Sequence, residues 1–387
     1  MRALDGLRVI DFTQMFAGPG TGMYLADQGA DVIKIEPPNG GRDRAADGGG
    51  DADSFLLLNR GKRSLVLDIR TEQGHEIVEK LVRRSDVMLV AFPPGQAEKL
   101  GLGYDAMAAL NPRLVYGNIT GWGYNGPIAM RTGYDRLQQA HTGMMHRNQA
   151  PDGTPMVLPF FVADQGIPML LSYGIMLALW NRERTGTGQK VDISQLDLQI
   201  AIQSLRLVFR EDDRAAAHGD FPAHIYKTKD GRWLTLVPIL ETEWARLWQT
   251  LGLSPETSDT LIRAKLAETF ATKPLAAWID LLEAANLPAA AVRTPEEFVQ
   301  HPQAWANDML VERQHPTHGA VKMMGTPIRL SDTPGHPGWP PPKFGEHTRE
   351  ILEELGYSAE QIDELAQQGT IKERWLLPSP SRPAWRG

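Results

Sequence analysis

A single carboxylate, Asp164, lies within the most apolar stretch of this chain, which reads MVLPFFVADQGIPMLLSYGIMLALW over residues 156–180. Aspartate is a preferred N-cap, and the residues that follow predict a helix that tolerates Pro168 in its first turn. The alternative is that this isolated carboxylate takes part in catalysis. The two roles are compatible, because N–H groups and the dipole at a helix N-terminus stabilise an anion.

Other residue types restrict the chemistry further. The sequence has no cysteine, which excludes disulfides, thiolate metal sites and cysteine nucleophiles. Its ten histidines form no H-x-x-x-H or H-E-x-x-H pattern, so we interpret His141, His146 and His224 as structural and expect no metal.

Charge and hydropathy limit the partners. A net charge of −7 argues against nucleic-acid binding, so any anionic ligand needs a local basic patch. The start of the chain, RALDGLRVIDF, lacks the apolar run of a signal peptide. The longest apolar run, residues 168–180, is shorter than the about 20 residues that cross a bilayer. We therefore expect a cytoplasmic protein with no membrane partner.

Strands and helices alternate in the first half of the chain. Residues 7–12 and 31–36 read as strands on either side of a helix, which predicts a βαβ unit with a parallel pair. Further strands are expected at SLVLDI, DVMLVAF and LVYGNIT, and Thr71 is a candidate N-cap for the helix between the first two. This alternation predicts a doubly wound α/β fold.

The second half has a different character. Residues 224–239 predict a hairpin around KDG, and amphipathic helices are expected over ETEWARLWQTLGL and residues 258–289. Two short helices divided by GYS are expected near the C-terminus. These patterns indicate a smaller α+β domain over roughly residues 225–325.

The first strand, turn and helix also suggest a dinucleotide site. Its fingerprint, G-x-G-x-x-G, requires a third glycine at a fixed spacing. Counted from Gly18 that position is Met23, and counted from Gly20 it is Leu25. The spacing therefore disfavours an NAD-dependent dehydrogenase.

Six segments in order resemble the family III CoA-transferases, of the formyl-CoA and carnitine CoA-transferase (CaiB–BaiF) type. They cover nearly the whole chain: LDGLRVIDFTQMFAGPGTGMYLADQGADVIKIEPPNGGRD, NRGKRSLVLDIRTEQG, LGLGYDAMAALNPRLVYGNITGWGYNGP, GYDRLQQAHTGMM, NRERTGTGQKVDISQLDLQIA and PPPKFGEHTREIL. The resemblance implies a Rossmann-like large domain with a smaller inserted α+β domain, in an interlocked homodimer. On this basis we expect residues 1–224 and 326–387 to form the large, CoA-binding domain and residues 225–325 the small one.

The resemblance also implies a reaction. The family's catalytic carboxylate precedes the helix that leads to RERTGTGQ, a position occupied here by Asp164. It would attack an acyl-CoA and carry CoA to a free carboxylic acid through aspartyl anhydride and aspartyl-CoA thioester intermediates. Coenzyme A enters as part of the substrate. The resemblance further implies a Gly-rich loop that closes the site, but the corresponding LVPILETEW contains no glycine.

Positions that line CoA in the family can be matched one by one. The implied CoA-binding residues are Gln14, Met15, Phe16, Ala17, Leu67, Asp68, Ile69, Arg70, Ala91, Phe92, Pro93, Lys99, Gly133, Tyr134 and Asp135. Among them Arg70 and Lys99 are the expected phosphate contacts, with Arg42 and Arg44 as further candidates. The cluster Arg60, Lys62 and Arg63 is an alternative cationic site, or pairs with acids at a subunit interface. Asp135 either bonds to the catalytic centre or caps a helix.

A sister branch of this family racemises 2-methylacyl-CoA esters with a histidine and an aspartate. Those enzymes carry GHD where this chain has GYD, at Gly133 to Asp135. Tyrosine, with a pKa near 10, is a poor base at neutral pH, so this alternative is disfavoured.

Overall fold

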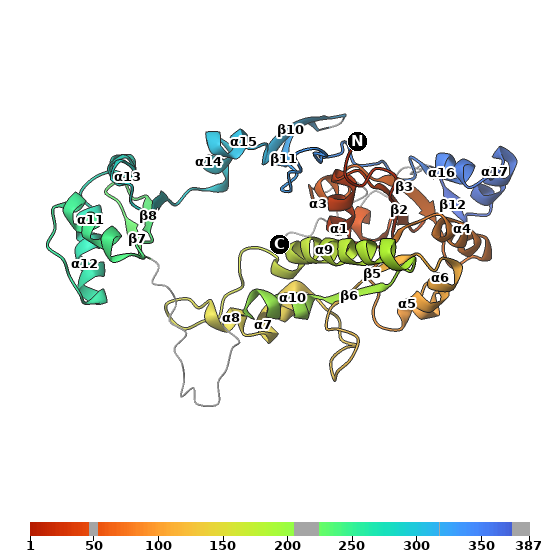
Figure 1. Ribbon diagram of the computed structural model, residues 1–387, viewed down its shortest axis with the longest axis horizontal. Helices are drawn as coiled ribbons and strands as arrows, with labels where there is room; N and C mark the ends of the chain where they lie inside the picture. Colours follow the sequence, from red (N-terminus) through yellow and green to blue (C-terminus); the bar gives the residue numbers. More distant parts are fainter. Residues whose placement is uncertain (46–52, 205–223, 317, 374–387) are drawn as a thin grey trace. The chain divides into compact units, whose positions relative to one another are not determined.

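The computed structural model describes residues 1–45, 53–204, 224–316 and 318–373 (Figure 1). The chain divides into two compact units. Met1–Leu207 and Asp308–Gly387 form the first unit, and Val208–Asn307 form the second.

The first unit is built on a seven-stranded sheet with the order β12-β3-β2-β1-β4-β5-β6. All neighbouring strands are parallel except β12, which pairs antiparallel with β3. The order 3-2-1-4-5-6 is that of dinucleotide-binding folds and confirms the expected α/β class. The strands are β1 (Arg8–Asp11), β2 (Asp31–Glu36), β3 (Arg63–Leu67), β4 (Val87–Val90), β5 (Val115–Thr120), β6 (Lys190–Ser194) and β12 (Ile371–Lys372).

Helices cover both faces of this sheet (Figure 1). Successive strand residues point to opposite faces, so Val9 packs under α1 (Ala17–Asp27) and α9 (Val162–Thr185), whereas Ile10 packs under α4 (Glu72–Arg83) and α16 (Thr348–Glu354). With both faces covered, the strands read as continuous apolar runs, and this is why the sequence reveals them clearly. The other helices among the described residues of this unit are α2 (Gly41–Ala45), α3 (Asp53–Leu58), α5 (Gln96–Lys99), α6 (Tyr104–Leu110), α7 (Asp135–His141), α8 (Met144–Arg147), α10 (Gln195–Ile202) and α17 (Ala359–Gln367).

Helix α4 has the N-cap that the sequence predicts. The Thr71 hydroxyl accepts the N–H of Gly74, as expected of an N-cap for α4.

Helix α9 has 24 residues and, by length and composition alone, could cross a membrane. Half of the most apolar stretch of this helix is buried in the fold, where Ile167, Leu171 and Ile175 belong to the core.

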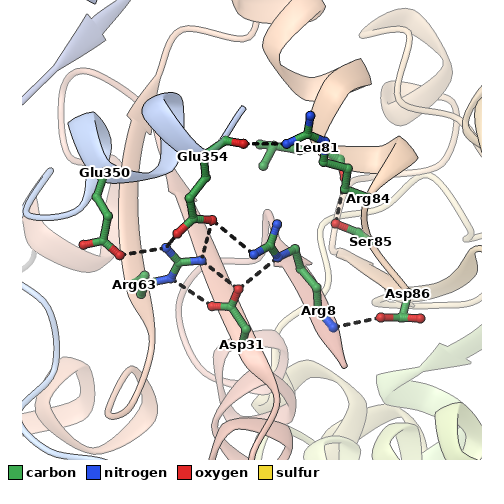
Figure 2. Close-up of polar contacts among 9 residues, drawn as sticks. All are labelled: Arg8, Asp31, Arg63, Leu81, Arg84, Ser85, Asp86, Glu350 and Glu354. Carbon is green, nitrogen blue, oxygen red and sulfur yellow. Dashed lines mark hydrogen bonds and ion pairs between the residues drawn. The ribbon is translucent and has the colours of Figure 1, made fainter. Parts of the chain in front are cut away.

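Ion pairs fix the later part of the chain to the sheet. Arg60 and Asp27 are fully buried and pair at 2.6 Å, and Arg60 also donates to the carbonyl oxygen of Met324, at the end of the hairpin formed by β10 (Leu310–His315) and β11 (Gly319–Met324). At the amino ends of the strands, Arg63 bridges Asp31 to two glutamates of α16, Glu350 and Glu354 (Figure 2). The cationic cluster Arg60, Lys62 and Arg63 thus pairs with acids of its own chain.

The second unit has a three-stranded sheet, β7 (His224–Lys227), β8 (Trp233–Leu236) and β9 (Ala289–Ala291). The antiparallel β7–β8 pair confirms the predicted hairpin. Helices α11 (Glu241–Leu251), α12 (Asp259–Phe270) and α13 (Leu275–Ala284) pack against it, and α14 (Pro295–Val299) and α15 (Pro302–Ala306) follow. The Gly-free loop before α11 is held by Glu243, whose carboxylate accepts the N–H groups of Ile239 and Leu240 at 2.8 and 3.0 Å.

Candidate active site

A cavity of about 580 Å³ opens at the carboxyl ends of β1, β4 and β5. Strands β1 and β4 are neighbours in the sheet, although β2 and β3 lie between them in the chain, so the chain reverses direction across the sheet at this point. Loops that leave two such strands diverge and leave a crevice, which is where open α/β sheets bind ligands. Its lining residues are Gln14, Met15, Phe16, Ala17, Gly18, Arg42, Ala91, Phe92, Pro93, Pro94, Ile119, Thr120, Gly121, Ala129, Met130, Arg131, Thr132, Gly133, Tyr134, Asp135, Arg136, Phe161, Asp164 and Gln195.

Asp164 lines this cavity from the first turn of α9. The helix begins at Val162 with Phe161 as its N-cap, so of the two interpretations of Asp164 the one as an N-cap is wrong. Asp135 performs that task from another helix, because its Oδ2 accepts the N–H of Ala163 at 2.6 Å. The Asp164 side chain therefore has no part in capping and faces the cavity.

The surroundings of Asp164 disfavour its charge. Burial raises its pKa, the nearby Asp135 carboxylate raises it further, and a hydrogen bond from Gln195 opposes both, which leaves the pKa at about 6. Any stabilisation of this anion by the helix N-terminus is therefore smaller than the combined effect of burial and of Asp135. At neutral pH the group is still mostly ionised, and an anion of higher pKa is a better nucleophile.

Gln195 is a site residue that the sequence reasoning missed. It is the first residue of α10, whose Ser194 N-cap ends β6, and its Nε2 donates to Asp164 Oδ1 at 2.8 Å. Its Oε1 is buried without a hydrogen-bond partner. A polar residue directly after a strand at the carboxyl edge of the sheet is the signal that could have revealed it.

The loop between β1 and α1 forms one wall and is held from below. Asp11 is fully buried and pairs with Lys62 at 2.8 Å, and it also accepts the N–H of Thr13 at 2.9 Å. Burial raises the pKa of Asp11, but Lys62 and Lys34 outweigh it and hold the pKa below its usual range. Next in this loop, Met15 has a φ of 69°, a left-handed conformation that is rare outside glycine. Such strain is found where the surrounding structure fixes a ligand-binding backbone.

Gly121 and Gly133 line another wall of the cavity. A Cβ on Gly133 would lie 2.5 Å from the Cα of Gly121, so the two backbones approach more closely than any side chain allows. Phe161 also lines the cavity, and the centroid of its ring lies 5.5 Å from that of Phe16.

Ten of the fifteen implied CoA-binding residues line the cavity together with Asp164. They are Gln14, Met15, Phe16, Ala17, Ala91, Phe92, Pro93, Gly133, Tyr134 and Asp135. The other five, Leu67, Asp68, Ile69, Arg70 and Lys99, are not among its lining residues.

These five residues lie at the end of β3, after it, or in α5. Leu67 is buried in the core and Ile69 packs against it. Arg70 is largely exposed and forms an ion pair with Asp68 at 2.8 Å, and Lys99 is exposed. Their role in CoA binding stays a prediction.

The two arginines after Pro37 differ. Arg42 lines the cavity, and its Nη2 lies 3.1 Å from the Tyr134 hydroxyl. Arg44 is buried, pairs with Glu36 at 2.6 Å and donates to the carbonyl oxygen of Pro342. The expectation that Arg44 reaches a phosphate is therefore wrong. Within the described ranges no group of three or more metal-ligating side chains occurs.

Comparison with known proteins agrees with this arrangement. The model of CoA-transferase family III matches residues 4–348. The chain is 35% identical over 382 residues to a succinate–glutarate CoA-transferase of Agrobacterium fabrum, covering 91% of this chain and 95% of that one. It is 32% identical over 399 residues to the succinyl-CoA:glutarate CoA-transferase of Mus musculus, covering 96% and 91%.

A solved structure agrees as well. A CAIB/BAIF family protein from Brucella suis is similar with a TM-score of 0.78 at 31% identity, covering 92% of this chain and 99% of that one. The chain therefore belongs to the family III CoA-transferases, enzymes that transfer CoA between carboxylic acids.

Proposed function

We propose that this enzyme moves CoA from an acyl-CoA thioester to a free carboxylic acid with Asp164 as the covalent carrier. The observation that carries the proposal is a carboxylate of raised pKa, held by Gln195, in a cavity at the carboxyl edge of the sheet. A raised pKa increases the nucleophilicity of the anion and leaves most of it ionised at pH 7.

The transfer has four balanced steps. An Asp164 oxygen attacks the thioester carbonyl, the C–S bond breaks, and CoA thiolate leaves a mixed anhydride. The thiolate then attacks the aspartyl carbonyl and releases the donor acid as its carboxylate. The acceptor carboxylate attacks the aspartyl thioester and expels the thiolate, giving a second anhydride. Attack of the thiolate on the acceptor carbonyl forms the new CoA ester and restores Asp164, with no net proton transfer.

The site residues have distinct tasks in this scheme. Gln195 orients the Asp164 carboxylate through its Nε2, and Asp135 fixes the start of α9. Phe16 and Phe161 form an apolar wall that limits water, which would hydrolyse both intermediates. Residues 14–17 and 91–93 line the cavity, and in this scheme their backbone contacts the extended arm of CoA.

The alternative within the same family is a 2-methylacyl-CoA racemase. Tyr134 lines the cavity where such an enzyme needs a basic histidine, and a tyrosine is a poor base at neutral pH. Incubation in deuterated water with a panel of acyl-CoA donors and free acids separates the two. New CoA esters that disappear in Asp164→Ala support transfer, whereas deuterium at C2 of an unchanged ester supports the racemase.

The acceptor panel should include dicarboxylic acids, because both curated relatives above are named for succinate or succinyl-CoA and glutarate. Acetate, butyrate and benzoate complete it with acids of one charge. If no acid accepts CoA from any donor, the transferase proposal fails.

We also propose that the enzyme is a homodimer, as the family resemblance implies. On α9, Met169, Tyr173, Leu177 and Trp180 are 50–68% exposed and lie on one face at helical spacing. A second copy would bury this stripe. Light scattering of the wild type and of Trp180→Glu tests this, and a monomeric wild type would contradict it. The expected cytoplasmic location stays a prediction.

A further inference from the structure

Three arginines, Arg42, Arg131 and Arg136, line the cavity that holds Asp164. None of them forms an ion pair within the described part of the chain, although this protein carries a net charge of −7. By contrast, Arg44 and Arg60 form buried pairs with acids. Cations that remain unpaired in the cavity of an acidic protein indicate an anionic ligand.

Of the three arginines, Arg136 is the one tied to the start of α9. It follows Asp135, whose carboxylate accepts the N–H of Ala163, the residue before Asp164. Its guanidinium carbon lies 5.6 Å from the centroid of the Phe161 ring, and Phe161 is the N-cap of α9. Contact with an aromatic face limits the orientations of a guanidinium and leaves its N–H groups free to bind a ligand.

Arg136 lines the same cavity as Asp164 but does not neutralise its charge. The two side chains form no ion pair, and the influences on Asp164 are burial, Asp135 and Gln195. A ligand that joins them must therefore have one end at Asp164 and a negative charge at the other. The rings of Phe161 and Phe16, in contact with each other, provide an apolar surface for the methylene groups between the ends.

We propose that Arg136 binds the second carboxylate of a dicarboxylic acyl group while its first carboxyl reacts at Asp164. This inference rests on the proposed function and narrows its substrate class. A planar guanidinium matches a carboxylate with two parallel N–H···O bonds, so it selects a dicarboxylic acid over a monocarboxylic acid of equal length.

The phosphates of CoA are the other source of negative charge in this site. If Arg136 binds these phosphates, its replacement should slow every reaction equally, whichever acid accepts CoA. If Arg136 binds the acyl group, its replacement should slow only the reactions of acids with a second carboxylate. The comparison of matched acids therefore separates the two.

The variants are Arg136→Met, which has an unbranched apolar side chain, and Arg136→Lys, which keeps the charge but lacks the two parallel N–H donors of a guanidinium. Arg113→Gln is the matched control, since Arg113 precedes β5 at the opposite edge of the sheet and pairs with Glu183. The acceptors are glutarate against pentanoate and succinate against butyrate, with one donor acyl-CoA throughout.

The wild type is expected to prefer each dicarboxylic acid over its partner. Arg136→Met should lower kcat/KM for glutarate and succinate about tenfold or more, mostly through KM, and leave pentanoate and butyrate within about twofold. Arg136→Lys should lie between, and Arg113→Gln should match the wild type. An equal loss for all four acids, or no loss, would overturn the proposal.

Calorimetric titration of glutarate and pentanoate into protein saturated with CoA gives a readout that needs no turnover. Tighter binding of glutarate that disappears in Arg136→Met supports the proposal, and equal binding of the two acids contradicts it. If glutarate binds in this manner but no acid ever receives CoA, the proposed reaction fails while the carboxylate site stands. If Arg136→Met weakens CoA itself instead, the residue serves the phosphates and the proposal is wrong.

Discussion

Replacing Asp164, the proposed catalytic carboxylate, should make this protein more stable. Burial and the Asp135 carboxylate raise the pKa of Asp164 from 3.8 to about 6, so the folded state carries a charge that it disfavours. At about 1.4 kcal/mol per pKa unit, the ionised group costs about 3 kcal/mol of folding free energy. Asp164→Asn removes the charge and keeps an oxygen that can accept the Gln195 N–H.

The sign of the pH dependence follows from linkage. Because the folded pKa lies above the unfolded one, the group's contribution to stability is complete below pH 3.8 and is lost as pH rises through 6. The neutral asparagine has no such dependence. The advantage of Asp164→Asn should therefore be small below pH 4, about 1.5 kcal/mol at pH 5 and about 3 kcal/mol at pH 8.

Differential scanning calorimetry of both proteins from pH 5 to pH 8 measures this difference. Asp105→Asn, in the first turn of α6 and exposed, is the matched control and should give no gain. Equal or lower stability of Asp164→Asn at pH 8, or a gain that is the same at pH 5, would refute the reasoning. The more stable variant is expected to lose transferase activity, because active sites often require groups that lower the stability of the fold.

Three further variants test the groups around the site and the sheet. Gln195→Met removes the bond that lowers the pKa of Asp164, so the acidic limb of the kcat/KM profile should move to higher pH; an unchanged limb would contradict this. Lys62→Met leaves the Asp11 carboxylate buried without this cation and should cost about 3–5 kcal/mol, measured by thermal unfolding; a loss below 1 kcal/mol would show that the pair is dispensable. Arg63→Gln removes the centre of the network in Figure 2, whose acids are partly exposed, so it should cost only about 1 kcal/mol and less in high salt; a large, salt-independent loss would oppose this.

The sheet was readable from the sequence because its strands are buried on both faces. The pattern DVIKIE predicts β2 with the bounds that the structure has, and the Thr71 hydroxyl marks the start of α4 correctly. Both signals are local, so they need no knowledge of the fold. The family resemblance predicts the catalytic role of Asp164, since its position in the sequence alone also fits an N-cap.

The contacts that the sequence did not reveal join distant residues. Gln195 lies 31 residues from Asp164, and Asp135 lies 28 residues from the N–H that it caps. The sequence suggests Arg44 as a phosphate ligand because it does not show that Glu36 neutralises this arginine in the core. Side-chain pairing across elements depends on packing, which residue types and spacing do not specify.

Oxygen labelling tests the covalent role of Asp164 most directly. The acceptor acid is supplied with ¹⁸O in both carboxylate oxygens, in unlabelled water, and allowed to react for one turnover. In the proposed steps one acceptor oxygen remains on the aspartate when the new CoA ester leaves. Mass spectrometry of the peptide that contains Asp164 should then show one ¹⁸O, and the next turnover should pass part of that label to the released donor acid. New CoA ester formed without label on Asp164 would contradict the account.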